Sequence, residues 1–287
     1  MIFIFILIIL FFFLIFYLYF ENTQLEVRNY KISGKKIPND FNDYKIVQIS
    51  DFHNTTSEKL RNSLINEIKN QKPNSIVLTG DLIDSRRTNI DAAIHFIKKI
   101  KDIAPIYFVS GNHEARIQNY HELKTKLANE DVILLNNKLE KIRNHSSNIN
   151  LLGIDDPGFK HKRSADVSTI IKNTINEIEY NKEIYTILLL HRPEMFDIYV
   201  KEKMDLVLTG HAHGGQIRLP FAGGIFAPRQ GLFPKYTSGA FHKNHTTMIV
   251  SRGIGNSIFP FRINNRPELV VVTLQRESSY KSQISKS

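Results

Sequence analysis

The 287-residue sequence predicts an α/β domain with mixed or parallel sheets, preceded by an N-terminal transmembrane helix. Three observations lead to this fold class. The chain opens on an uninterrupted apolar run, short β-branched runs recur from Tyr44 onward, and segments with helical apolar spacing lie between those runs. Hydrophobic residues make up 42% of the chain and charged residues 23%, which is ordinary for a globular protein and excludes general disorder.

The apolar run from Ile2 to Phe20 carries no charge and is long enough to cross a bilayer as a helix. It lacks the basic start and the small-residue cleavage site of a signal peptide, and it ends in aromatic residues typical of a membrane interface. We expect an uncleaved, single-pass anchor in the cell membrane over residues 1–20 and a connector with an edge strand over 21–43. Basic residues follow the run and none precedes it, which slightly favours a cytoplasmic position for the rest of the chain.

Buried strands are expected where short β-branched runs are bounded by turn residues, namely at residues 44–50, 75–80, 106–111, 132–135, 149–154, 185–190, 205–210, 247–251 and 268–274. Helices are expected where apolar residues recur three and four apart, around Leu60–Ile68, Ile90–Ile100 and Ile171–Ile178. No repeat or low-complexity linker interrupts this alternation. Residues 44–275 therefore form one predicted domain, followed by a polar tail over 276–287.

The net charge of +10 favours an anionic partner, such as a phosphate, a nucleic acid or a membrane surface, with simple solubility as the alternative. The chain contains no cysteine. Disulfides, thiolate nucleophiles and cysteine-based zinc sites are thereby excluded. Any metal ion must be held by nitrogen and oxygen ligands.

Metal-binding residue types gather where the predicted strands end. His211 and His213 follow one apolar run, and the glycines directly after them allow a turn in which both imidazoles converge. The other strand ends supply Asp51, His53, Asp81, Asn112, His113, Glu114 and His191. Each residue alone is more typical of a turn or a helix cap. Ligands of α/β sheets bind at the carboxyl ends of strands, so the joint placement predicts a metal site suited to manganese, iron or zinc.

In chain order these motifs read DFH, GD, GNHE, H and GHAH, a series that resembles the signature of the calcineurin-like metallophosphoesterases from about Tyr44 to Leu274. The stretches GHAHGGQIRLP, SRGIG and FRINNRPELVVVTL look most like bacterial membrane-associated phosphodiesterases of the YkuE and YaeI type. The blocks GDLIDSR and SGNHE depart from the GDxVDRG and RGNHE of the family's protein Ser/Thr phosphatases. This departure argues against a phosphoprotein substrate.

The resemblance implies a four-layer sandwich of two packed mixed β-sheets flanked by helices. It also implies two divalent metal ions at the strand ends, with manganese preferred and iron or zinc as alternatives. One ion would be held by Asp51, His53, Asp81 and His213, and the second by Asp81, Asn112, His191 and His211, so that Asp81 bridges. His113 would face the leaving group as an acid or charge stabiliser, oriented by Glu114.

The expected activity is that of a membrane-anchored, metal-dependent phosphoric ester hydrolase. It would cleave a phosphodiester or pyrophosphate bond of a small or lipid-linked phosphoester by attack of a metal-activated hydroxide. A metal-dependent nuclease is the alternative, although no nucleic-acid-binding motif is present and nucleic acid is not an expected partner. A non-catalytic scaffold of the same fold is the third hypothesis, disfavoured by the complete ligand set.

The stretch RLPFAGGIFAPRQGLFPKY (218–236) follows His213 and mixes cations with aromatic residues, in a region from Leu206 to Pro267 without acidic residues. One interpretation is an irregular solvated loop. The other is a substrate loop, in which Arg218, Arg229 and Lys235 face anionic groups and the apolar side chains face acyl chains or the bilayer.

Overall fold

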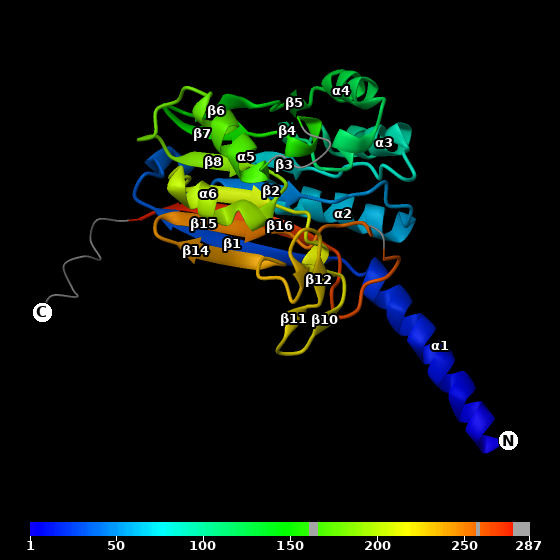
Figure 1. Cartoon of the computed structure of the whole chain (residues 1–287). Coiled ribbons are helices and arrows are strands. Elements are labelled where there is room, and N and C mark those ends of the chain that lie inside the picture. Colours follow the sequence, from blue (N-terminus) through cyan, green and yellow to red (C-terminus); the bar gives the residue numbers. More distant parts are fainter. Residues whose placement is uncertain (161–165, 257–258, 278–287) are drawn as a thin grey trace, which may run out of the picture.

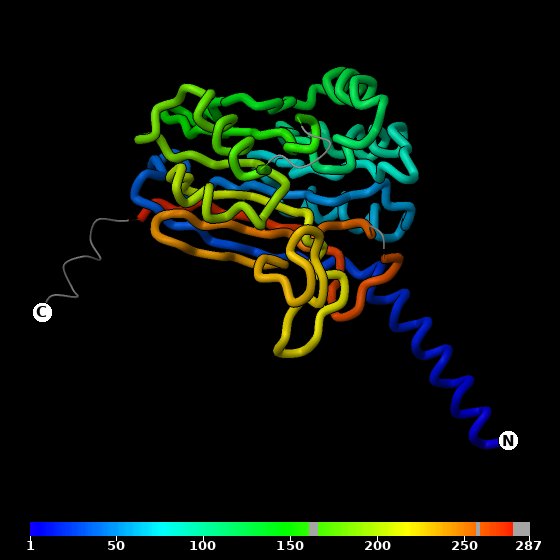
Figure 2. Tube along the Cα trace, viewed as in Figure 1, coloured from blue at the N-terminus to red at the C-terminus, as the bar shows by residue number. Residues whose placement is uncertain are grey.

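The structure is a computed structural model that describes residues 1–160, 166–256 and 259–277 (Figure 1). Two six-stranded sheets make up the body of the molecule, and helices cover their outer faces (Figures 1 and 2). The predicted fold class, two packed mixed sheets flanked by helices, is confirmed. From residue 278 onward, the predicted polar tail lies outside the described residues.

The first sheet has the strand order β1-β16-β2-β3-β4-β5. Strands β2 to β5 run parallel, β16 is antiparallel to β2, and β1 pairs with β16 in parallel at the edge. The strands are β1 (Glu26–Gly34), β2 (Lys45–Ile49), β3 (Ser75–Thr79), β4 (Ile106–Val109), β5 (Ile133–Leu134) and β16 (Glu268–Arg276). Helices α2 (Glu58–Gln71), α3 (Ile90–Ile100) and α4 (Tyr120–Ala128) belong to the layer that covers this sheet.

The second sheet has the strand order β14-β15-β9-β8-β7-β6. Its four central strands run parallel, and the outer strands β14 and β6 are antiparallel to their neighbours. The strands are β6 (Lys138–Asn144), β7 (Ser147–Gly153), β8 (Thr186–Leu189), β9 (Leu206–Thr209), β14 (Gly239–Lys243) and β15 (Thr246–Val250). Helices α5 (Val167–Asn176) and α6 (Phe196–Lys201) pack on its outer face.

The central strands are buried on both faces, which explains why they read as continuous apolar runs in the sequence. In β2, Val47 and Ile49 pack with the helices of the first layer, whereas Ile46 packs with residues of the second sheet. Burial of each such side chain contributes about 1.5–3 kcal/mol to folding. This packing holds the parallel strands of each sheet in register and thereby fixes the positions of the loops at their carboxyl ends.

Local sequence signals explain where the helices begin. Ser57 caps α2 by accepting a hydrogen bond from the backbone N–H of Leu60, and Asn89 caps α3 through the N–H of Ala92. Short 3-10 turns link other elements: η1 (Asn39–Phe41), η2 (Glu114–Arg116), η3 (Pro157–Phe159), η4 (Pro193–Met195) and η5 (His213–Gly215).

Helix α1 (Ile2–Thr23) extends away from the body (Figure 1) and is long and apolar enough to cross a membrane. Two short hairpins project from the same end of the molecule (Figure 2), formed by β10 (Arg218–Leu219) with β11 (Gly223–Gly224) and by β12 (Phe226–Ala227) with β13 (Gly231–Leu232). Asn264 links the two regions, since its side chain accepts a hydrogen bond from Tyr17 of α1 and donates one to the carbonyl of Arg218. We call residues 216–236 the hairpin module.

Candidate metal centre

The carboxyl ends of five parallel strands bring the predicted metal-binding residues together. Asp51 and His53 follow β2, Asp81 follows β3, and the Asn112–Glu114 segment follows β4 in the first sheet. In the second sheet, one predicted ligand follows β8 and two follow β9, namely His191, His211 and His213. All of these side chains are buried.

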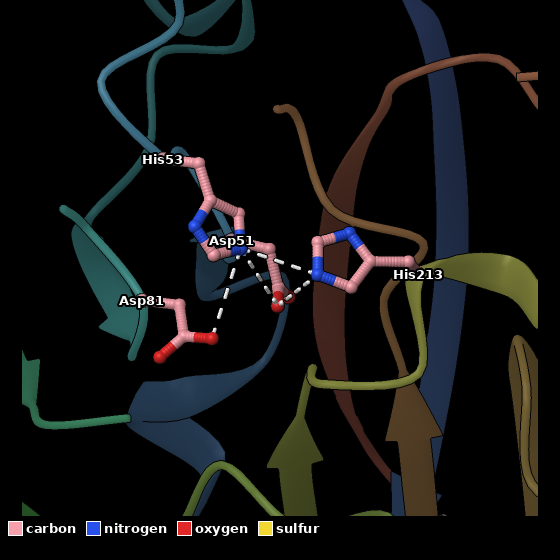
Figure 3. Close-up of side chains that lie close together, drawn as sticks. All are labelled: Asp51, His53, Asp81 and His213. Atoms are coloured by element: carbon pink, nitrogen blue, oxygen red, sulfur yellow. Dashed lines mark hydrogen bonds and ion pairs between the residues drawn. The ribbon is translucent and has the colours of Figure 1, made fainter. Parts of the chain in front are cut away.

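The first cluster consists of Asp51, His53, Asp81 and His213, whose donor atoms lie within 4.8 Å of one another (Figure 3). The Nε2 atoms of His53 and His213 are 3.2 Å apart, and the Nε2 of His213 lies 3.3 Å from Oδ1 of Asp51. The Nε2 of His53 lies 3.7 Å from Oδ2 of Asp81. Ligand atoms of side chains from both sheets thus converge on one point.

The second cluster consists of Asp81, His191 and His211, so Asp81 belongs to both clusters. The Nδ1 of His191 lies 2.7 Å from the carbonyl oxygen of Thr79, a contact in which the ring nitrogen donates, and its Nε2 lies 3.1 Å from Oδ2 of Asp81. The buried Oδ1 of Asn112 and Nε2 of His211 have no hydrogen-bond partner among the described residues. Such orphaned buried acceptors are what an absent cation would satisfy.

The pKa values of the histidines in the two clusters fit a site for divalent metal ions. Burial lowers the pKa of His53 and of His213 to about 3, so both rings are neutral near pH 7 and each presents a lone pair. Burial would also lower the pKa of His191, but the carboxylates of Asp81 and Asp51 outweigh it and raise the pKa to about 10. The two carboxylates thus place negative charge where the donor atoms converge, and a bound cation would balance that charge.

The backbone at the centre is strained. Asp51, His53, Asp81, His211 and His213 all have φ between 47° and 69°, in the left-handed region that side chains with a Cβ rarely occupy. Such positions cost about 1–3 kcal/mol each and cluster at functional sites. The surrounding sheets therefore hold the ligands in place at the expense of stability.

Gly214 shows why the turn after the histidines needs glycine. Its φ is 63°, and a Cβ at this position would overlap the side chain of Asn265. That side chain donates hydrogen bonds to the carbonyls of His213 and Gln216. The close approach thus fixes the backbone that carries His213.

His113 lies beside both clusters, with its ring centroid 4.5 Å from that of His53. Its Nδ1 accepts a hydrogen bond from the backbone N–H of Ser85 at 3.0 Å. The proton of the neutral ring is therefore on Nε2, which lies 3.9 Å from Oδ2 of Asp81. Burial lowers the pKa of His113 despite the neighbouring carboxylates of Asp81 and Asp84.

Glu114 was predicted to orient His113, but its hydrogen bonds are to backbone groups of the loops after β3 and β4. Its carboxylate accepts hydrogen bonds from the backbone N–H groups of Asp81, Ile83 and Gly111, at 2.7 to 3.1 Å. Burial and the charge of Asp81 raise its pKa to about 7. These contacts join the loops after β3 and β4, so Glu114 positions Asp81 through the backbone.

Asp84 is the residue beside His113 that the sequence analysis missed. Its Oδ1 lies 3.4 Å from the Nδ1 of His113, and the second aspartate of the GDLID motif was the signal that could have identified it. Burial alone would raise the pKa of Asp84, but hydrogen bonds from Arg86 and Arg87 lower it far below its ordinary value. Asp84 is therefore a fixed negative charge next to the imidazole.

A polar pocket of about 610 Å³ opens beside the first cluster. His53 forms part of its wall, and the rest includes Arg86, Arg87, Asn89 and Asn256. The two arginines are exposed and were not predicted as site residues. This pocket offers cationic and amide groups to an anionic or polar part of a ligand.

The three predicted cations of the hairpin module have different environments. The guanidinium of Arg218 donates hydrogen bonds to the carbonyl of Gly214 at 2.8 Å and to the hydroxyl of Thr237 at 3.2 Å. Arg229 and Lys235 are exposed, and the ammonium of Lys235 lies 5.1 Å from the centroid of the Tyr236 ring. Arg218 thus joins the module to the residues that flank it on either side, whereas the other two cations are exposed.

Comparisons with known proteins agree with this geometry. The model of the calcineurin-like phosphoesterase family matches residues 44–215. The chain is 30% identical over 263 residues to the uncharacterized metallophosphoesterase YkuE of Bacillus subtilis, covering 90% of this chain and 88% of that protein. It is 27% identical to the phosphodiesterase YaeI of Escherichia coli, covering 80% and 82% of the two chains.

Among solved structures, TT1561 of Thermus thermophilus matches with a TM-score of 0.51 at 11% identity, over 74% of this chain and 90% of that one. This likeness concerns the fold. The family model covers most of the predicted domain, and it includes every predicted metal-binding residue. The chain therefore belongs to the calcineurin-like phosphoesterase family and is a metal-dependent phosphoester hydrolase.

Proposed function

We propose that this protein is a membrane-anchored phosphodiesterase or pyrophosphatase that uses two divalent metal ions and acts on a lipid-linked phosphoester. The single observation that carries the reaction type is the pair of buried Asp/His clusters that share Asp81. One cluster would hold the first ion through Asp51, His53, Asp81 and His213. The other would hold the second ion through Asp81, Asn112, His191 and His211.

The nitrogen and oxygen ligand set favours manganese, with iron or zinc as alternatives. When bound, the two ions supply an acidified water as nucleophile and offset the charge of the phosphoryl oxygens. The chain itself supplies the rigid placement of the ligands. Strained loops after β2, β3 and β9 and the Glu114 contacts to backbone amides keep the two clusters from relaxing apart.

His113 is proposed to act on the leaving-group oxygen through its Nε2–H, either by donating a hydrogen bond from the neutral ring or by transferring a proton from the imidazolium, which then returns to the neutral ring. Support comes from the Ser85 hydrogen bond to Nδ1, which places the proton of the neutral ring on the other nitrogen. Asp84 would stabilise the positive charge if the ring gains a second proton, because its Oδ1 lies 3.4 Å from Nδ1. A positioned acid of this kind contributes roughly 10²–10⁴ to the rate.

Arg86 and Arg87 are proposed to bind the anionic or polar part of the substrate that does not react. Both line the polar pocket next to His53, and Asp84 fixes the guanidinium of Arg86 by accepting from Nε and Nη2 at 3.0 Å. Arginine in this arrangement retains free donors for a phosphate or carboxylate.

Membrane anchoring is proposed from the α1 helix, whose residues from Ile2 to Phe16 are exposed and apolar. We propose a single-pass anchor in the cell membrane, with the catalytic domain on the cytoplasmic side as the charge pattern favours. Exposed Arg229 and Lys235 lie on the hairpin module at the same end of the molecule, where each would gain about 1 kcal/mol from an anionic leaflet.

The test uses the full chain in phospholipid nanodiscs with added Mn²⁺. We expect about two metal ions per chain and hydrolysis of bis-p-nitrophenyl phosphate that a chelator abolishes. Faster cleavage of single- or double-stranded DNA than of the model diester would favour the nuclease instead. Bound metal without hydrolysis of any phosphoester would favour the non-catalytic scaffold.

A further inference from the structure

We infer that an apolar cavity beside His213 binds the hydrocarbon chain of an amphiphilic phosphoester substrate. The inference rests on the proposed phosphoesterase function and deepens it, because it names the part of the substrate that the hairpin module recognises. The cavity has a volume of about 370 Å³ and is lined by Gly215, Gln216, Ile217, Ile225, Phe226, Pro228 and Phe259.

The chemistry of the lining selects an apolar occupant. Gln216 is the single polar side chain among the described lining residues, and none of them is charged. The volume falls within the roughly 300–1,000 Å³ typical of small-molecule sites. Hydrocarbon that enters such a cavity loses contact with water, and that transfer is favourable.

The position of the cavity relative to the metal centre identifies what the hydrocarbon is attached to. Gly215 lies two residues after His213, whose Nε2 is 3.2 Å from that of His53. His53 in turn lines the polar pocket that contains Arg86 and Arg87. Phe259 lines the apolar cavity and its neighbour Pro260 lines the polar pocket.

The polar pocket is thus lined by His53 of the metal centre, the apolar cavity is lined by a residue two positions after His213, and the consecutive residues 259 and 260 line one space each. A phosphoester at the metal centre with a polar group on one side and an alkyl or prenyl chain on the other would fill both spaces. A substrate with two polar arms would leave the apolar cavity empty.

Backbone hydrogen bonds fix the walls of the cavity. The N–H of Ile225 donates to the carbonyl of Ile217 at 2.9 Å, and the N–H of Arg218 donates to the carbonyl of Ile263 at 3.0 Å. Ile217 also pairs with Ile263 as an isolated bridge. The cavity is thus present before any ligand binds, which reduces the conformational entropy lost on binding.

The surroundings indicate where such a substrate comes from. The hairpin module exposes further apolar side chains: Leu219, Phe221, Leu232 and Phe233. The neighbouring Asn264 binds Tyr17 near the end of α1, so the module lies beside the proposed membrane helix. We therefore infer that the substrate is a lipid of the adjacent leaflet, which would move only a short distance out of the bilayer to enter this cavity.

The experiment compares the full chain with two variants, all in identical nanodiscs, on p-nitrophenyl alkyl phosphodiesters from methyl to decyl. The Phe226→Ser/Phe259→Ser variant alters the cavity, and Phe221→Ser is the matched control because Phe221 is exposed on the same module but does not line the cavity. Partitioning into the nanodisc affects the three proteins equally. We expect kcat/KM of the full chain to rise roughly fourfold per added methylene until the cavity is full. The Phe226→Ser/Phe259→Ser variant should lose most of this rise. The Phe221→Ser control should keep it.

A photoactivatable decyl phosphate provides a second readout that requires neither turnover nor bound metal. We expect the full chain to be labelled in peptides that contain Ile217, Ile225 or Phe259, with methyl phosphate of the same photochemistry giving little labelling there. Identical chain-length dependence in all three proteins, or label confined to α1, would overturn the inference. Absence of hydrolysis of even the methyl diester would instead count against the proposed function.

Discussion

The metal centre and the hairpin module are built from opposite kinds of surface. At the centre, charged and polar side chains are buried and their backbone is strained, with Asp51 and Asp81 almost completely inaccessible to water. In the hairpin module, large apolar side chains are exposed on strands of two residues each, and Phe221 is fully accessible. Each region departs from the usual rule that polar groups face water and apolar groups are buried.

Both departures are costly unless a partner satisfies them. Buried carboxylates require a compensating cation, and an exposed apolar patch requires an apolar cover. The two regions meet at residues 213–216, where the turn that carries His213 leads directly into the module. From this difference we propose that catalysis and membrane location depend on adjacent but separable parts of the chain, and the following variants test that separation.

The largest effect is expected from Asp81→Asn, because Asp81 is the one side chain shared by both clusters. The amide removes a negative charge that both ions would use. We expect loss of measurable diester hydrolysis and metal content well below two ions per chain, determined by inductively coupled plasma mass spectrometry.

Asp205→Asn is the matched control, since Asp205 lies at the amino end of β9 and pairs with Lys36. This variant should retain its metal content and its activity. Normal metal content and turnover in Asp81→Asn would contradict the bridging role.

His113→Ala should have the next largest effect and a different signature. In the proposed assignment the imidazole lies beside the two clusters and is not a ligand of either ion, so metal content should stay at the level of the full chain. We expect kcat to fall by roughly 10²–10⁴, the range for a positioned acid.

The loss on His113→Ala should shrink for diesters whose leaving group is a good one, because protonation then matters less. The measurement is kcat for a series of aryl methyl phosphodiesters of graded leaving-group pKa. An equal loss across the series would exclude the acid role.

Much of the fold was predictable because the central strands are buried on both faces. Runs such as YKIVQIS and SIVLTG are long enough to stand out, and α3 follows the predicted apolar spacing. Strands β6 and β14 were not predicted, because half-exposed edge strands mix charged and apolar residues. Helices α4 and α6 were missed because they are short and their apolar faces are defined only by tertiary packing.

The candidate ligands were predictable because each one follows a recognisable strand. The sequence does not show which residues outside the motifs contact the site. Arg86 and Arg87 look like ordinary surface charges until the fold places them in one pocket with His53, and the hydrogen bond of Arg218 to Gly214 depends on the turn around that glycine. Such contacts join segments far apart in the chain and carry no periodic signal.

Arg218→Met tests whether that side chain stabilises the protein by joining the module to its flanking residues. The variant keeps an apolar stem but loses the hydrogen bonds to Gly214 and Thr237. Leaving these acceptors unsatisfied should lower the free energy of unfolding by about 1–3 kcal/mol. Denaturant unfolding in a detergent micelle measures this change, and an unaltered midpoint would show that the bonds contribute nothing to stability.

Arg229→Glu/Lys235→Glu should act on location without changing that midpoint. Each exposed cation is expected to contribute about 1 kcal/mol near an anionic leaflet. With a lipid-linked phosphoester, the double variant should lose the preference of the full chain for nanodiscs rich in phosphatidylglycerol over phosphatidylcholine. A preference that survives the double substitution would remove these cations from the membrane contact.

The smallest effect on chemistry is expected from deletion of residues 1–20. This removes the apolar helix and the exposed hydrogen bond between Tyr17 and Asn264, but it keeps Glu21 and Asn22. Glu21 is buried and accepts hydrogen bonds from the backbone of Asn265 and the guanidinium of Arg266, and Asn22 accepts from Asn256 and the backbone of Arg262. We therefore expect the shortened protein to leave the membrane fraction and to hydrolyse a water-soluble diester as fast as the full chain.

Deletion of residues 1–23 is the comparison that locates the boundary between anchor and domain. It removes Glu21 and Asn22 as well, and loss of hydrogen bonds to a buried charged group costs about 1.5–3 kcal/mol. We expect thermal denaturation at a lower temperature than for the 1–20 deletion, measured by circular dichroism. If the 1–20 deletion is folded but inactive on the soluble diester, α1 contributes to the site itself, and the separation of chemistry from location fails at this end of the chain.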